Sequence, residues 1–152
     1  MKNLEIATFV LSIISILLAV ISAVHSIYVY IQTVKHDKKQ ATLDAFNILQ
    51  EQVLDKINLY SNSKIKEIAE DARSKEYKEL TILMARIEHF SVGVNTEIYD
   101  LKIVKRLAGK HFCMLFDKLR PMIEKKRKIN KTDKHYDEFE KLVEELNCLY
   151  QK

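Results

Sequence analysis

The sequence predicts an all-α protein in which a single N-terminal transmembrane helix is followed by a small cytosolic helical bundle. Three observations predict this class. There are only 2 Gly and 1 Pro among 152 residues, which disfavours turn-rich β architecture. No Asp, Glu, Lys or Arg occurs from Ile6 to Val34. After that run, apolar residues recur at alternating spacings of three and four, the period of an amphipathic helix.

These patterns divide the chain into three segments. We expect a transmembrane anchor over residues 1–36, a helical stalk or connector over 37–75 and a helical domain over 76–152. The 29 uncharged residues would form a helix of roughly 43 Å, against a hydrocarbon core of roughly 30 Å. A cleaved signal peptide would have an apolar region of only about 7–15 residues. An uncleaved anchor is therefore favoured.

The charges that flank the apolar run predict its orientation. The side that precedes it carries Lys2 and Glu5, whereas the side that follows carries Lys35, Lys38 and Lys39. Because the more basic flank stays in the cytoplasm, we expect a single-pass protein of the cell inner membrane with its N-terminus outside and its C-terminal domain in the cytosol.

Small residues form a stripe along one side of the expected anchor helix. They follow one another at spacings of 4, 3, 4, 3 and 4: Thr8, Ser12, Ser15, Ala19, Ser22 and Ser26. Small side chains let two helix backbones approach closely, and their hydroxyls can bond across the contact. We call these six residues the small-residue stripe, and they predict pairing with a second copy or with a partner membrane protein.

The first helix after the anchor should follow a weak break at residues 36–39. Its apolar face consists of residues at spacings of 3, 4, 4 and 3: Phe46, Leu49, Val53, Ile57 and Tyr60. The polar residues 61–63 should end it, and Ser63 should cap a short helix that extends to Ala72.

The remaining residues predict further helices. The clearest has an apolar face over residues 80–94, with Gly93 allowing the chain to turn. Asp100 should cap a short helix over 101–108 that Gly109 closes. Another apolar face covers 112–119, before Pro121. After a polar break at 131–133, the last helix should extend over 136–150.

Several segments together resemble a family of bacterial single-pass proteins catalogued as a domain of unknown function. The matching pattern is E-x-x-x-V-G-V at 88–94, R-L-x-G at 106–109, P-x-I-x-x-x-R at 121–127 and F-x-x-L at 139–142. The segment K-K-Q-A-T-L-D at 38–44 matches the start of the family's cytosolic part. The resemblance covers essentially the whole chain. It implies the same architecture and no activity.

Glu88 is a candidate for a structural ion pair. It lies between Ile87 and Phe90, so part of its side chain should face the bundle interior, where an unpaired carboxylate is costly. Arg127 or Arg106 could supply a forked partner. We expect a Glu88–Arg127 pair that is structural, with a ligand site as the alternative interpretation.

Catalytic and metal-binding motifs are absent from the sequence, so we expect no cofactor and no metal site. Cys113 and Cys148 form no C-x-x-C motif and should be thiols in a reducing compartment. One fragment, Arg106 to His111, resembles the R-x-x-x-x-H motif of HEPN-type ribonucleases, which are all-helical and dimeric. The apolar neighbours Leu107 and Phe112 disfavour that interpretation.

A basic run near the end of the chain could contact an anionic leaflet or a nucleic acid. It contains six cations within ten residues: Lys125, Lys126, Arg127, Lys128, Lys131 and Lys134. Each basic residue near an anionic membrane surface contributes about 1 kcal/mol. No aromatic residues alternate with these cations, so nucleic-acid binding is disfavoured. A solvated helix end is the simplest interpretation.

These features favour a membrane-anchored, oligomeric and non-catalytic interaction module. The first alternative is a membrane effector or accessory protein in a bacterial stress or anti-phage response. The second is a ribonuclease that uses Arg106 and His111.

Overall fold

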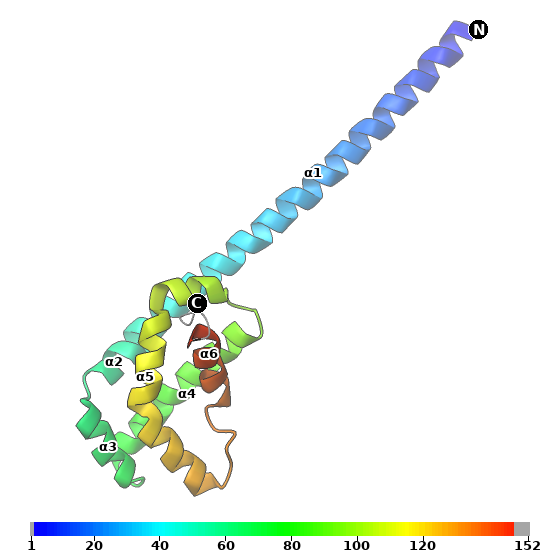
Figure 1. Ribbon diagram of the computed structural model, residues 1–152. Coiled ribbons are helices and arrows are strands. Elements are labelled where there is room, and N and C mark those ends of the chain that lie inside the picture. The colour runs from blue at the N-terminus through cyan, green and yellow to red at the C-terminus, as the bar shows by residue number, and fades with distance from the viewer. Residues whose placement is uncertain (1, 148–152) are drawn as a thin grey trace. The chain divides into compact units, whose positions relative to one another are not determined.

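The computed structural model describes residues 2–147, and no strand occurs among them. The elements in chain order are α1 (Lys2–Leu49), the π-helix η1 (Gln50–Leu54), α2 (Asp55–Asn58), α3 (Asn62–Glu70), α4 (Lys75–Asn95), α5 (Leu101–Asn130) and α6 (Asp137–Asn147) (Figure 1). The predicted all-α class is therefore confirmed. Predictions on Cys148 and Tyr150 lie outside the described residues.

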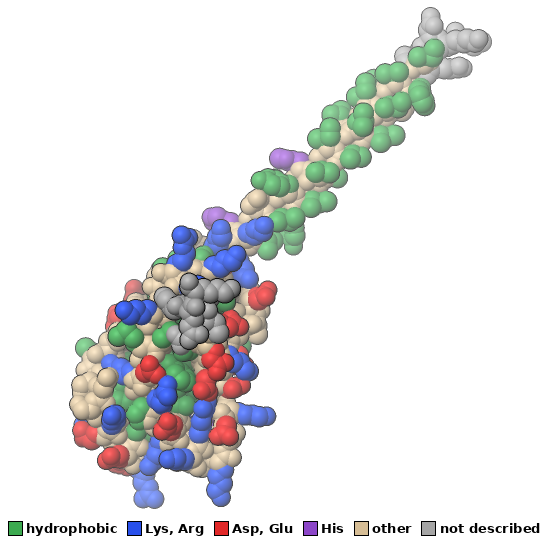
Figure 2. Space-filling view, in the orientation of Figure 1, with side chains coloured by type: hydrophobic (Ala, Val, Ile, Leu, Met, Phe, Trp, Pro, Cys, Tyr) green, Lys and Arg blue, Asp and Glu red, His purple; other side chains and the backbone are tan. Residues whose placement is uncertain are grey.

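The chain divides into two compact units, Met1–Asp37 and Lys38–Lys152, and the division falls within α1. The weak helix break that we expect at residues 36–39 does not occur. In the first unit, the apolar side chains of α1 are exposed along its length (Figure 2). This is the one described helix that is long and apolar enough to cross a membrane, and its most apolar window contains no buried residue.

The second unit is a helical bundle. Helix α4 packs on α6, α5 packs on both α3 and α6, and η1 packs on α4. Residues of the expected stalk belong to the same core as the expected domain: Phe46, Leu54 and Ile65 are buried together with Leu80, Phe112 and Leu146. The bundle therefore begins at Lys38 and includes the segment that we expected to be a separate connector, because its apolar face is buried there.

A cluster of aromatic rings joins four helices at the centre of the bundle. The ring of Phe112 in α5 stacks on that of Phe90 in α4, with centroids 5.9 Å apart and planes within 7°. The same Phe112 ring meets Phe139 of α6 edge-on at 6.2 Å and Phe46 of α1 at 6.5 Å. Edge-on and offset-stacked pairs of this kind stabilise a core beyond the area they bury.

The helix ends agree only in part with the sequence-based expectations. Asp100 caps α5 as predicted, accepting a hydrogen bond from the backbone N of Lys102 at 2.9 Å. Helix α3 is capped by Ser61 rather than by Ser63. The expected stop at Gly109 is instead a kink at Ala108, and α5 continues to Asn130. It continues because buried Phe112, Leu115 and Leu119 extend its apolar face beyond the kink.

Candidate functional site

Glu88 caps the N-terminus of α6 from the neighbouring helix α4. Its Oε1 atom accepts a hydrogen bond from the backbone N of Glu138 at 3.1 Å, and its Oε2 atom accepts one from Phe139 N at 2.8 Å. The first N–H groups of a helix lack partners within the helix, so an outside carboxylate can satisfy them. Burial raises the pKa of the Glu88 carboxyl, and these two hydrogen bonds partly offset that increase.

The predicted Glu88–Arg127 ion pair is therefore wrong. Arg127 instead pairs with Glu140, with Nη2 and Oε2 2.6 Å apart, and its Nε donates to the carbonyl oxygen of His135 at 3.0 Å. Both side chains hold the start of α6, but through separate partners. Glu88 needs no cation, because two backbone donors already satisfy its carboxylate.

The six cations of the basic run lie at and just beyond the C-terminal end of α5 and do not act as a uniform group. Lys125 donates to the carbonyl oxygen of Glu70 at 3.2 Å, and Arg127 holds His135 and Glu140. Lys131 ends α5 in a left-handed conformation with φ of 50°. Lys128 and Lys134 are exposed, and Lys126 is half-buried. Part of the run therefore stabilises the bundle.

Arg106 and His111 lie beside the kink of α5 and line one hollow of about 440 Å³. Arg106 is exposed, whereas His111 is half-buried and its Nε2 atom is buried without a hydrogen-bond partner. The kink thus brings the two motif residues to one hollow, but it turns one imidazole nitrogen inward.

Within the small-residue stripe, three serine hydroxyls donate hydrogen bonds to the backbone of their own helix. Ser12 donates to the carbonyl oxygen of Thr8 at 2.9 Å, Ser15 to that of Leu11 at 2.9 Å and Ser26 to that of Ser22 at 2.8 Å. Their donors are engaged within α1, so a contact along the stripe would depend on close backbone packing. The stripe is exposed in this single chain.

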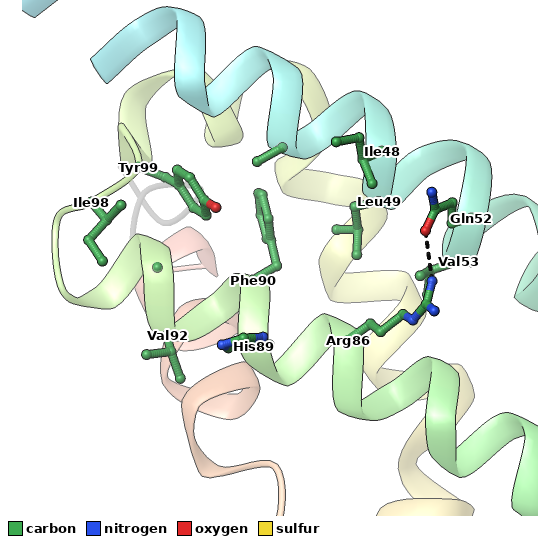
Figure 3. Close-up of a pocket in the computed structure, with 12 residues that line it drawn as sticks. Ile48, Leu49, Gln52, Val53, Arg86, His89, Phe90, Val92, Ile98 and Tyr99 are labelled. Atoms are coloured by element: carbon green, nitrogen blue, oxygen red, sulfur yellow. Dashed lines mark hydrogen bonds between the residues drawn. The ribbon is translucent and has the colours of Figure 1, made fainter. Parts of the chain in front are cut away.

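A cavity of about 420 Å³ opens on the bundle between the end of α1, η1 and α4 (Figure 3). Its apolar wall comes from Ile48, Leu49, Val53, Phe90, Val92 and Ile98. Its polar lining residues are Gln52, Arg86, His89 and Tyr99, and no Asp or Glu lines it. An apolar cavity with a few converging polar groups is the usual form of a binding site for a small molecule.

The wall of this cavity depends on a close approach that only glycine allows. A Cβ atom built at Gly93 would stand 2.6 Å from Cδ2 of the Tyr99 ring. The Tyr99 ring stacks on Phe90 with centroids 5.3 Å apart, and its backbone N donates to the Gly93 carbonyl oxygen at 2.8 Å. Gly93 is thus inside α4 without a left-handed turn, contrary to the expectation that it turns the chain.

The π-helix η1 contributes Gln52 to the polar end of the cavity. Gln52 lies in η1, and its Oε1 atom accepts a hydrogen bond from Nη1 of Arg86 in α4 at 2.7 Å (Figure 3). Short π-helical segments inside α-helices occur frequently at functional sites.

The cavity belongs to a larger apolar surface. A second hollow of about 510 Å³ shares Arg86 with it and is lined by Leu59 and Ile82. Four large apolar side chains on this surface are strongly exposed: Ile48 (56%), Leu59 (85%), Ile82 (60%) and Ile98 (63%). Ile48 lies on α1 and Ile82 on α4, whereas Leu59 directly follows α2 and Ile98 follows α4; we call these four residues the α1–α4 face. The sequence analysis did not predict this face. The signal available was that Ile48 and Ile82 are apolar residues outside the buried faces of their helices.

The fold and this face define an all-α protein that combines one candidate membrane helix with a bundle bearing an apolar cavity. The chain belongs to the family described as domain of unknown function DUF4760, whose model matches residues 13–146. No curated protein and no solved structure shows a significant match to this chain.

Proposed function

We propose that this protein is a membrane-anchored, oligomeric and non-catalytic interaction module whose bundle lies on the cytosolic side of a bacterial inner membrane. The observation that carries the proposal is the exposed apolar surface of α1. Ile16, Leu18, Ile21 and Val24 are each more than half exposed, and neighbouring positions are similar. Exposing apolar surface to water costs about 25 cal/mol per Å², and a bilayer removes that cost.

The small-residue stripe supports association of the α1 anchor with a second copy or with a partner membrane helix. Its members have small side chains on one side of α1, whereas Leu, Ile and Val occupy the other sides. In a bilayer, where apolar side chains gain nothing by leaving lipid, close packing of small residues favours helix pairing. The tether also raises the effective concentration of the bundle toward other membrane proteins.

The α1–α4 face supports an interaction role for the bundle. It presents four exposed apolar side chains beside two exposed cations, Lys56 and Arg86. Exposed apolar groups that are gathered around hollows are typical of surfaces that bind a partner or ligand.

Cysteine cross-linking in native membranes tests the association. In a Cys113→Ser, Cys148→Ser background, Ser15→Cys and Ser22→Cys should form disulfide-linked dimers on mild oxidation. Leu17→Cys and Val24→Cys, on the opposite side of the helix, are the matched controls and should not. Equal cross-linking at all four positions, or none at any, would contradict the association.

A ribonuclease remains the second candidate, because Arg106 and His111 line the same hollow. We favour the non-catalytic role and expect Arg106→Ala with His111→Ala to leave any cellular phenotype intact in a folded protein. RNA cleavage by the wild type that this double variant loses would favour the enzyme instead.

A further inference from the structure

We propose that the cavity between α1, η1 and α4 binds a small amphiphilic carboxylate, with Arg86 receiving the carboxylate and the apolar wall receiving its body. The inference rests on the proposed function in one respect, since the ligand would contact Ile48 and Ile98 of the α1–α4 face that the module presents. It adds the chemical class of a ligand to the interaction role proposed for that face.

The volume and lining of the cavity fit a ligand of this size. About 420 Å³ lies within the range of roughly 300–1,000 Å³ that is usual for small-molecule sites. The apolar wall includes Phe90 and two strongly exposed side chains at the edge, Ile48 and Ile98. An acyl chain of medium length would cover these side chains and remove apolar surface from water.

The charges at the cavity select an anion. Arg86 has no carboxylate within 4.0 Å among the described residues, and no acidic side chain lines the cavity. His89 is the other ionisable base on the lining, and it is exposed. A guanidinium that lacks an acidic partner beside an apolar cavity can pair with a ligand anion, and its forked geometry matches a carboxylate.

The receiving group is held in place before any ligand binds. Gln52 accepts one N–H of Arg86 at 2.7 Å, which orients the guanidinium and leaves its other donors for a ligand. The aromatic side of the cavity is equally fixed, because Tyr99 packs on Gly93 and stacks on Phe90. A site that is already ordered loses less entropy on binding.

Photoaffinity labelling of the full chain in lipid nanodiscs tests the proposal. The probes are a decanoate that carries a photoreactive diazirine and the corresponding decanol, with labelled residues located by mass spectrometry. Both probes should partition into the bilayer and label residues 8–34 of α1, which provides an internal reference. We expect the decanoate probe also to label cavity residues, about tenfold more than decanol does.

Two variants and their matched controls locate the site. Arg86→Gln should reduce labelling of the cavity by decanoate about tenfold, and Ile98→Glu should reduce it by placing a charge against the apolar body of the ligand. Arg73→Gln replaces an exposed arginine of the α3–α4 loop, and Ile129→Glu an exposed isoleucine at the end of α5. Neither lines the cavity, so both controls should label as the wild type does.

Two results would overturn the proposal. The first is labelling of α1 residues 8–34 with no labelling of the cavity. The second is equal cavity labelling by decanoate and decanol that Arg86→Gln leaves unchanged. Either result would leave the proposed module standing, because the disulfide-linked dimers test its association independently. Loss of those dimers with persistent cavity labelling would contradict the oligomer alone.

Discussion

A half-buried carboxylate needs hydrogen-bond donors more than it needs a cation, and Glu88 obtains both of its donors from the backbone at the start of α6. The spacing between Ile87 and Phe90 correctly predicts that Glu88 is part-buried. Its partner could not be predicted, because the free N–H groups of a helix that begins fifty residues later leave no mark in side-chain spacing. The partners of Arg127, the His135 carbonyl oxygen and the Glu140 carboxylate, could not be predicted either, because the turn between α5 and α6 brings them to it.

Removing the Glu88 cap should destabilise the bundle independently of Arg127. Glu88→Gln removes the charge and leaves one acceptor oxygen in place of two, so it should cost about 1–2 kcal/mol of unfolding free energy. Arg127→Met should cost about 1 kcal/mol or more through loss of the Glu140 and His135 contacts. Urea unfolding of the four proteins in detergent, followed by circular dichroism, measures these values. The double variant should be at least as unstable as the worse single variant, and recovery in it would show a direct pair instead.

Gly93→Ala should destabilise the bundle because the new methyl group would enter the ring of Tyr99. Overpacking of this kind typically costs about 1–3 kcal/mol. In a Tyr99→Ala background the same change should cost nothing or stabilise by up to about 1 kcal/mol, since Ala is the better helix former. Thermal melts of the four proteins measure the difference. A similar cost in both backgrounds would mean that Tyr99 does not set the requirement for glycine.

At the scale of helices, a buried threonine ties α1 to the start of α5. The Oγ1 atom of Thr42 donates to the Lys38 carbonyl oxygen at 2.7 Å and accepts from the backbone N of Asp100 at 2.8 Å. The side chain is fully buried. Thr42 lies in the K-K-Q-A-T-L-D segment at 38–44, but the pattern alone does not indicate its partner.

Thr42→Val keeps the shape of this side chain and removes its oxygen, which leaves the Asp100 N–H without an acceptor. We expect a loss of about 1–3 kcal/mol in unfolding free energy. Thr42→Ser retains the hydroxyl and should lose less. The two variants are compared by urea unfolding, and equal losses would show that packing of the methyl group, rather than the hydrogen bond, is what matters.

Helices and several of their ends could be predicted because periodicity and caps are local signals. The Asp100 cap and the apolar faces of α4 and α6 are examples. The π-helix at 50–54 and the kink at Ala108 could not, since neither interrupts the spacing of apolar residues in a way that marks it. The cavity could not be predicted either, because Gln52, Arg86 and Tyr99 meet only through tertiary packing.

For the whole molecule, composition alone identifies the candidate membrane helix. The 29 residues without a charge stand out in the sequence itself, and their side chains described in α1 are exposed. We expected the helical domain to begin at residue 76, whereas the compact unit that contains it begins at Lys38. Burial of Ile65 and Ile68 places α3 inside the bundle instead.

Accessibility of engineered cysteines in intact cells tests the membrane-anchored arrangement most directly. In a Cys113→Ser, Cys148→Ser background, Asn3→Cys should react with a membrane-impermeant maleimide added outside. Lys131→Cys should react only after the membrane is permeabilised. Labelling of Lys131→Cys but not Asn3→Cys in intact cells would reverse the orientation, and recovery of the protein in the soluble fraction would contradict the anchor itself.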